Sequence, residues 1–482
     1  MNKGNSQEIV GIGVSTIKHI GKIVAVFLVA YVGALTLPYV GHKKVSGNIK
    51  KVFQAEDCYG DTKGQERVAY INDNVEALKY RLKMISEAKE EVILSTFDFN
   101  ADSSGKDVMC ALLEAAERGV KVRVIVDGGN GFLDMKVKSA EWFQALASHE
   151  NIDIQIYNPV NLLKPWKLQA RLHDKYVIVD DKMYLLGGRN TTNLFLGDYS
   201  DSKNIDRELF VYKEDESSKG SIHQLKAYFE SVWNLKDSKE YECKKETEEV
   251  KQCLSDLKNR TEKVKKLYPE AYEEWNWQEL TVDTNKVTLL QNPIEAENKE
   301  PVMWYTITEL MKSGDDVTVY TPYIICGKEM YEDLTQICEE AETVEIITND
   351  VSSGANPWGC TDYLNQKEKI WATGVQVYEF MGEHSSHTKA VLIDERMSLV
   401  GSYNMDMRST YQDTELMLAV DSVALNEQIR QEAERDKLAS RTMTESGEYE
   451  YGPEYQAKEM STGKKIFYGV LRVITVPIRR FL

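Results

Sequence analysis

One short pattern of residues occurs twice in this chain. A histidine is followed two positions later by lysine, seven positions later by aspartate, fourteen later by glycine and seventeen later by asparagine. The two copies are His173, Lys175, Asp180, Gly187 and Asn190, and His387, Lys389, Asp394, Gly401 and Asn404. At ordinary residue frequencies one H-x-K-x4-D match is expected about once per ten thousand positions. The repetition indicates two similar halves that build one site together.

Each lysine begins a short run rich in β-branched and aromatic residues, which is typical of a buried strand. Residues i and i+2 of a strand share a face, so the histidine and lysine of each copy point the same way. A second apolar run (183–186 and 397–400) leads into G-G-R-N or G-S-Y-N, which predicts a hairpin that returns Asn190 and Asn404 to the site. Asp180 and Asp394 stand at the strand ends, where a turn or a structural hydrogen bond competes with a catalytic role. We assign them the structural role.

This residue set suits substitution at phosphorus without a metal. One histidine nitrogen can attack a phosphodiester, and the second histidine can protonate the leaving alcohol. Two lysines and two asparagines can stabilise the charge of the transition state. The attacking histidine needs a carboxylate or carbonyl partner on its other nitrogen, and Glu208 and Glu415, each on the strand-like run after its motif, are the candidates. We expect no cofactor and no metal site.

With its paired H-x-K-x4-D motifs the chain resembles the phospholipase D superfamily. Gly187-Gly-Arg-Asn190, and Gly401-Ser-Tyr-Asn-Met-Asp-Met-Arg-Ser409 with the later Glu415, are similar to the patterns of bacterial cardiolipin synthases. The resemblance covers most of residues 70–420. It implies a two-lobed α/β fold and a phosphohistidine intermediate without a metal. Residues 198–206 depart from the family pattern in a loop expected to border the acceptor site, which leaves the acceptor open.

Carried over to this sequence, the resemblance also implies individual roles. His173 becomes the nucleophile and His387 the general acid and base. The remaining motif residues would bind phosphate: Lys175, Lys389, Asn190 and Asn404. Which histidine attacks first stays open on the sequence alone.

Strand and helix patterns repeat in the same order in both halves. Residues 91–97 and 120–127 flank a helical pattern, as do 316–322 and 344–349, which predicts a βαβ unit at the start of each lobe. We therefore predict two similar lobes, each a mixed, largely parallel sheet flanked by helices, with one active site at their interface. The predicted domains are a membrane segment and linker (1–50), the first lobe (51–235), a charged helical insert (236–285), the second lobe (286–440), and a polar linker with a basic amphipathic tail (441–482).

Both ends of the chain suggest a membrane. Residues 23–40 are uncharged and just long enough to span a bilayer, so we predict a single N-terminal transmembrane segment in the cell membrane; a secretory signal peptide is the alternative. The lysines that follow this run outnumber by one those that precede it, which leans slightly toward a cytoplasmic catalytic body. Residues 464–482 mix five basic residues with bulky apolar ones. They fit an interfacial helix that attracts anionic lipid, or a helix or strand docked on the core.

Composition narrows the substrate class. A net charge of −18 argues against a nucleic-acid substrate, although a local basic groove would leave a nuclease possible. Seven scattered cysteines without a C-x-x-C motif argue against a zinc site or a disulfide framework, and weakly favour a reducing compartment.

These observations predict a membrane-anchored phosphatidyltransferase of cardiolipin synthase type. It would form a phosphatidyl-histidine from a phospholipid, phosphatidylglycerol or also phosphatidylethanolamine, and pass the phosphatidyl group to the hydroxyl of a second phospholipid. The alternative enzyme is a phospholipase D that hydrolyses phospholipids to phosphatidic acid, and the non-enzymatic one is a lipid-binding protein. No nucleic-acid partner is expected, and the oligomeric state stays open.

Overall fold

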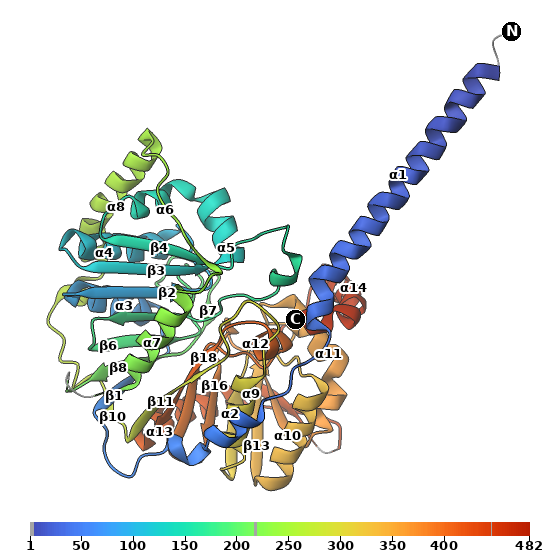
Figure 1. Ribbon diagram of the computed structural model, residues 1–482. Coiled ribbons are helices and arrows are strands. Elements are labelled where there is room, and N and C mark those ends of the chain that lie inside the picture. Colours follow the sequence, from blue (N-terminus) through green and yellow to red (C-terminus); the bar gives the residue numbers. More distant parts are fainter. Residues whose placement is uncertain (1–3, 216–218, 445) are drawn as a thin grey trace.

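Two α/β lobes lie side by side, and one long helix projects from them (Figure 1). The computed structural model describes residues 4–215, 219–444 and 446–482. Each lobe is built on one nine-stranded mixed sheet with helices packed against it. The predicted fold class, two similar α/β lobes, is confirmed.

The first sheet is formed by residues 66–283. In order across the sheet its strands are β10 (Val282–Asp283), β1 (Glu66–Ile71), β8 (Glu208–Lys213), β6 (Met183–Gly187), β5 (Tyr176–Val179), β2 (Glu91–Thr96), β3 (Lys121–Asp127), β4 (Ile152–Tyr157) and β9 (Ser238–Glu240). The βαβ unit expected at its start is β2, α4 (Ser103–Glu117) and β3, with the two strands parallel.

The second sheet repeats this order. Its strands are β11 (Lys286–Gln291), β18 (Leu416–Asp421), β17 (Met397–Gly401), β16 (Ala390–Ile393), β12 (Asp316–Tyr320), β13 (Thr343–Asn349), β14 (Gln376–Phe380), β19 (Ser440–Met443) and β20 (Tyr449–Tyr451). Among the described strands of these two sheets, parallel pairing is confined to β2–β3–β4 and β12–β13–β14. The sheets are therefore less parallel than expected, because the motif strands form antiparallel hairpins at their centre.

Helices pack against both faces of the sheets, and in each lobe one of them lies on the face turned toward the other lobe. Those of the first lobe are α3 (Asn74–Glu87), α4, α5 (Gly128–Leu133), α6 (Ala140–Ala147), α7 (Ser221–Trp233) and α8 (Glu248–Leu267). Those of the second are α9 (Val302–Met311), α10 (Lys328–Glu340), α11 (Pro357–Trp371), α12 (Met407–Tyr411), α13 (Val423–Leu438) and α14 (Thr462–Ile478), and α2 (Gly47–Val52) precedes the first strand.

Apolar packing joins the lobes into one body. Leu186 and Leu209 of the first sheet belong to the same buried cluster as Val400 and Leu418 of the second. Contacts of β17 with β6 and β8 bring the motif hairpins of the two lobes together. Two short strands, β7 (Asn204–Ile205) and β15 (Ser385–Ser386), pair in parallel across the lobe boundary. The central strands that carry the motifs are thus fixed by buried apolar packing between the lobes.

The predicted helical insert and the predicted polar linker with its tail also contribute strands. In residues 236–285, helix α8 buries Val250, Leu257 and Val264 and packs on α4 and α6, while β9 and β10 on either side of it join the first sheet. In residues 441–482, β19 and β20 extend the second sheet, and α14 packs on α11. These segments therefore belong to the lobes beside them.

Helix α1 (Gly4–Thr36) projects away from both lobes, and a short turn (Leu37–Tyr39) connects it to them (Figure 1). Among the described residues, His19–Tyr39 is long and apolar enough to cross a membrane, and its apolar window is not buried by the rest of the chain. Most of the predicted span, residues 23–40, lies within this stretch. Residues 1–3 at the start of the predicted N-terminal domain are outside the described residues.

Candidate active site

The two motifs have the same local geometry. Strand β5 begins directly after Lys175 and pairs with β6, and β16 begins directly after Lys389 and pairs with β17. The backbone N–H of the motif glycine donates to the carbonyl of the motif lysine at 3.2 Å in both copies. Each hairpin therefore carries its histidine and lysine at one end and its asparagine just beyond the returning strand.

Each motif histidine is reached by a segment of the opposite lobe. Leu172 forms a parallel bridge with Thr414, whose backbone N–H donates to the carbonyl of Arg171 at 2.9 Å. On the other side Ser386 pairs with Ile205, and the N–H of His387 donates to the Ile205 carbonyl at 2.6 Å. These backbone contacts place the residue after Thr414 beside His173 and the residue after Ile205 beside His387.

Those next residues are both carboxylates. His173 Nδ1 lies 2.8 Å from Glu415 Oε1, and His387 Nδ1 lies 2.6 Å from Asp206 Oδ2. Both acidic side chains are fully buried. Each imidazole is thus oriented by a carboxylate from the other lobe, which leaves Nε2 as the nitrogen available for chemistry.

The structure corrects the predicted role of Glu208 as the carboxylate partner of a motif histidine. Its carboxylate accepts two hydrogen bonds from Arg81, at 2.6 and 2.7 Å, and Asp206 takes the place beside His387. Strand register explains the difference, since Gly187 pairs with Glu208 whereas Gly401 pairs with Met417. The similar letters E-L-F and E-L-M are therefore offset by two residues, and Asp206 is the counterpart of Glu415.

The residue after each motif glycine lies against the carboxylate of its own lobe. A Cβ atom at Gly188 would come within 2.5 Å of Asp206 Oδ2, so only glycine leaves room there. The equivalent position in the second copy is Ser402, whose hydroxyl donates to Glu415. The G-G-R-N and G-S-Y-N sequences thus accommodate a buried carboxylate in two ways: the glycine leaves room for it, and the serine donates a hydrogen bond to it.

The motif lysines are buried and act on both histidines. Lys175 Nζ donates to the carbonyl of His173; Lys389 Nζ donates to that of His387 and lies 2.6 Å from His387 Nδ1. Burial lowers the pKa of Lys175 to about 8 and that of Lys389 to about 7. The charge of Lys389 also lowers the pKa of His173, and that of Lys175 lowers the pKa of His387. The two motifs therefore share one electrostatic site.

Both histidines are neutral in this site. Burial, followed by the neighbouring Lys389, lowers the pKa of His387 to about 3, and burial with Lys175 holds that of His173 well below its ordinary value. Burial raises the pKa of Glu415 to about 8. For Asp206, burial acts in the opposite sense to Lys389, and the net pKa is lowered. A neutral imidazole can act as a nucleophile or a base.

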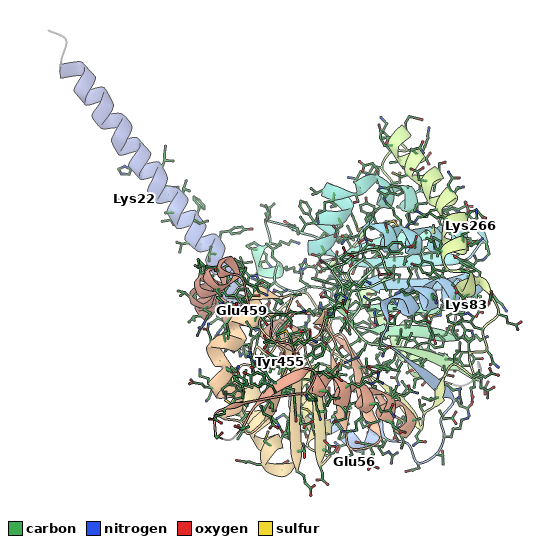
Figure 2. All side chains as sticks on the ribbon, turned by 180° about the vertical axis from the view of Figure 1, so that it is seen from behind. Lys22, Glu56, Lys83, Lys266, Tyr455 and Glu459 are labelled. Carbon is green, nitrogen blue, oxygen red and sulfur yellow. The ribbon has the colours of Figure 1, made fainter. Side chains whose placement is uncertain are left out.

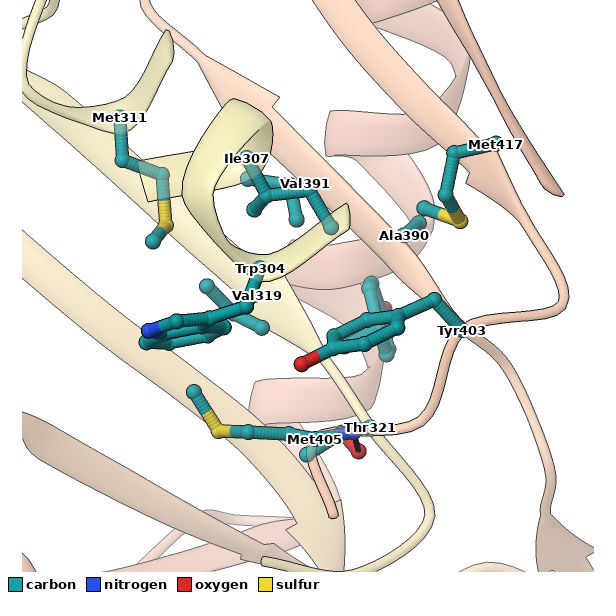
Figure 3. Close-up of a pocket in the computed structure, with 11 residues that line it drawn as sticks. Trp304, Ile307, Met311, Val319, Thr321, Ala390, Val391, Tyr403, Met405 and Met417 are labelled. Carbon is teal, nitrogen blue, oxygen red and sulfur yellow. Dashed lines mark hydrogen bonds between the residues drawn. The ribbon is translucent and has the colours of Figure 1, made fainter. Parts of the chain in front are cut away.

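The asparagines lie at the ends of the returning strands and are almost completely buried. Asn190 accepts a hydrogen bond from the backbone of Asp98 at 3.3 Å. Asn404 Oδ1 has no hydrogen-bond partner among the described residues. Tyr403 and Met405 on either side of it line an apolar cavity of about 20 Å³, which is packed core rather than substrate space (Figure 3). Packing thus holds the Asn404 amide in place, and its Oδ1 can still accept a hydrogen bond.

Asp180 and Asp394 are located in the hairpin turns. Their φ angles are +53° and +49°, and Asp180 accepts hydrogen bonds from the backbone N–H groups of Lys89, Glu90 and Glu91. Asp394 accepts equivalent bonds from residues 315 and 316. Both carboxylates therefore tie a hairpin turn to the start of the adjacent strand, at the end of the hairpin away from the histidines.

Residues that were not predicted complete the site. Thr414 Oγ1 accepts the backbone N–H of His173 at 3.1 Å, and Asp413 Oδ1 accepts that of Arg171 at 3.1 Å. Asp413 is held in turn by Arg408, which lies in the quoted M-D-M-R-S stretch. In the described ranges no group of three or more His, Cys, Asp or Glu side chains is arranged to hold a metal ion.

Comparison with known proteins finds a family whose match to this chain is divided between the two lobes. A family described as "Cardiolipin synthase, PLD-like domain" matches residues 82–233 and 306–437, one segment in each lobe. The chain belongs to this family. Cardiolipin synthase C of Escherichia coli is 23% identical over 404 residues, which cover 75% of this chain and 83% of that protein. An uncharacterised protein of Helicobacter pylori is 25% identical over 404 residues, with 75% and 77% covered.

Among solved structures, phosphatidylserine synthase of Haemophilus influenzae has the same fold. It superposes with a TM-score of 0.61 at 14% identity and covers 90% of this chain and 100% of its own. The predicted membership of the phospholipase D superfamily is confirmed by the family match.

Proposed function

We propose that this protein is a membrane-anchored phosphatidyltransferase of cardiolipin synthase type. The observation that carries the proposal is the pair of neutral histidines, each bonded through Nδ1 to a buried carboxylate of the opposite lobe. Binding alone would not need two histidines with free Nε2 atoms beside two buried lysines. The likeness to Escherichia coli cardiolipin synthase C supports a phospholipid substrate.

In the first step His173 Nε2 attacks the phosphorus of a donor phospholipid. A P–N bond forms, the P–O bond to the headgroup alcohol breaks, and His387 supplies the proton that the leaving oxygen takes up. With phosphatidylglycerol as donor the leaving group is glycerol. The negative phosphodiester favours protonated His387 once it is bound, because an opposite charge nearby raises a histidine pKa.

In the second step the hydroxyl of another phospholipid gives its proton to neutral His387 and attacks the same phosphorus. The P–N bond breaks, His173 is released, and two joined phosphatidyl units leave as cardiolipin. Lys175 and Lys389, with Asn190 and Asn404, stabilise the non-bridging oxygens in both steps. These roles require no metal ion.

The assignment of His173 as nucleophile has a local argument beside the family resemblance. Its Nδ1 faces one carboxylate, Glu415, whereas Nδ1 of His387 lies 2.6 Å from both Asp206 and Lys389. A nucleophile needs one fixed tautomer, and a single carboxylate partner fixes it more strictly. A general acid and base must exchange its proton in each half-reaction, which suits the more polar surroundings of His387.

The test is lipid product analysis. Purified protein in detergent–lipid micelles is incubated with phosphatidylglycerol, alone and with phosphatidylethanolamine, beside His173→Ala. We expect cardiolipin together with released glycerol, or ethanolamine when phosphatidylethanolamine is the donor. Phosphatidic acid as the sole product would make the protein a phospholipase D. Absence of any His173-dependent product would refute the enzymatic proposal.

Membrane anchoring is part of the proposal. The stretch His19–Tyr39 supports it by length and composition, and its apolar window is not buried by the rest of the described chain. A fusion series with reporters after residue 45 would establish on which side the catalytic body lies. We expect the cytoplasmic side; a reporter signal from the opposite side of the membrane would overturn that orientation.

A further inference from the structure

The C-terminal helix α14 is apolar on two faces. Tyr468, Leu471 and Thr475 are buried, and α14 packs on α11. The opposite face exposes large apolar side chains at helical spacing: Ile466, Phe467, Val470, Val473, Ile474 and Val476. The docked face packs on the second lobe, whereas the second face is exposed in the described part of the chain.

A loop of the first lobe exposes a second set of apolar side chains. Between β4 and the first motif, Leu162 is 65% exposed, Leu163 87% and Trp166 46%. Side chains of this size are seldom so exposed on a loop unless they contact something outside the chain. The exposed Lys164 lies among them.

Both surfaces adjoin the foot of α1. The hydroxyl of buried Tyr39, in the turn after α1, donates to the carbonyl of Trp166 at 2.8 Å. On the other side the carbonyl of Arg480, just beyond α14, accepts a hydrogen bond from Gln412 at 2.7 Å, and the ring of the neighbouring Tyr411 stacks on His42 at 4.1 Å. Figures 1 and 2 both show α14 beside the end of α1, while Lys22 lies far out along α1.

The charge around α14 fits an anionic surface. Lys465, Arg472 and Arg480 are exposed on or next to the helix, although the whole chain carries a net charge of −18. An apolar face with basic neighbours is the composition of a helix that lies in the headgroup region of a bilayer. Continuity with a candidate membrane-spanning helix selects a lipid surface over a protein partner.

We propose that α14 and the loop 160–166 form a second membrane contact, in which both insert their exposed apolar side chains into the headgroup layer of an anionic bilayer around the foot of α1. Each lobe contributes one part of this contact. The contact therefore fixes the orientation of the whole catalytic body on the membrane. The loop continues into Arg171 and His173, which brings the first motif close to that lipid surface.

The test maps lipid contact directly and does not depend on turnover. The full chain is reconstituted in vesicles of phosphatidylcholine, or of equal parts phosphatidylcholine and phosphatidylglycerol, with a trace of phosphatidylcholine that carries a photoreactive group in its acyl chain. After irradiation the labelled peptides are identified by mass spectrometry. We expect label in 159–168 and 462–482 as well as in α1, and more of it in the vesicles with phosphatidylglycerol.

Matched variants locate the contact. Val473→Asp on α14 and Leu163→Asp in the loop should each lose most of the label in their own peptide and keep the label of α1. Val423, the first residue of α13, is similarly exposed, and Figure 1 shows α13 away from α1 and α14, so Val423→Asp should leave the label unchanged. Thermal unfolding checks that each variant remains folded.

Label confined to α1 in the wild-type protein would overturn the proposal, whatever the variants do. Label that is independent of phosphatidylglycerol and of salt would overturn its electrostatic part. Because the readout is a cross-link, an inactive protein that still shows the predicted map would refute the proposed reaction and leave this contact standing.

Discussion

Asp206 of the first lobe and His387 of the second meet across the lobe boundary, with Oδ2 2.6 Å from Nδ1. The equivalent contact joins His173 of the first lobe to Glu415 of the second. Each lobe therefore supplies a carboxylate that the histidine of the other lobe needs. A carboxylate in this position holds the imidazole in one tautomer and stabilises its cation, which is the role of the aspartate in a catalytic triad. Asp206 is therefore a positioning residue that acts through His387.

Replacing Asp206 by Asn should lower kcat by up to about 10⁴-fold, the size of the loss when the triad aspartate is replaced in a serine protease. The measurement is cardiolipin formation by purified protein. The matched variant is Glu208→Gln, which removes the partner of the buried Arg81. It should cost ~3–5 kcal/mol of stability and spare the rate of the protein that remains folded. Equal rate losses in the two variants would contradict the assignment.

The order of the two histidines can be tested with a phosphatidyl ester whose leaving group is an activated phenol. Such a leaving group needs no proton, so His387→Ala should still form the covalent phosphoenzyme and then accumulate it. His173→Ala should form none. A radiolabelled phosphatidyl group retained on denatured protein measures this.

The result is decisive in either direction, because label on His173→Ala and none on His387→Ala would reverse the two roles. Absence of label on both variants and on the wild type would argue for direct displacement without an intermediate.

Much of this site follows from the sequence. Short apolar runs after Lys175 and Lys389 predict the motif strands, and the equal spacing predicts two alike hairpins. Helix α14 was harder, because its apolar residues serve two faces and give no single stripe. The strand order also depends on pairings between distant segments, such as β1 with β8 and β11 with β18, which periodicity alone does not specify.

Asp206 could not be predicted because its position depends on tertiary register. The segment between motif and carboxylate is five residues longer in the first copy than in the second, counted from His173 to Asp206 (33) and from His387 to Glu415 (28). Local similarity then favours Glu208, which lies two residues after Asp206, at the start of β8. The pairing of Ile205 with Ser386 across the lobe boundary places Asp206, and not Glu208, beside His387.

The lysines should carry much of the transition-state stabilisation. Lys175→Ala and Lys389→Ala should each lose about 3–4 kcal/mol, as when an oxyanion donor is removed. Comparison of kcat/KM for each variant and the wild type gives this value directly. Because these cations balance the charge on phosphate, EDTA should leave the wild-type rate unchanged. A rate within twofold of wild type in either variant, or inhibition by EDTA, would refute the role given to the lysines.

The same lysines predict the pH dependence. Burial lowers the pKa of Lys389 to about 7 and that of Lys175 to about 8. A lysine is charged below its pKa and neutral above it, and the phosphate needs the charged form. We therefore expect kcat/KM, which reports the free enzyme, to fall as the pH rises through about 7 to 8. A profile that stays flat up to pH 10 would show that neither lysine titrates there.

The motif aspartates should affect stability rather than chemistry. Asp180 accepts three backbone N–H groups at 2.9 to 3.1 Å and adopts φ +53°. Asp180→Ala leaves these donors unpaired and puts an unsuitable residue in a left-handed turn, which should cost at least ~1–3 kcal/mol. Asp180→Asn keeps an oxygen acceptor and tolerates the turn, so it should retain most of the stability. Thermal unfolding measures both, and kcat of the folded fraction should match the wild type. A loss of kcat in Asp180→Asn at unchanged stability would assign the residue to the chemistry instead.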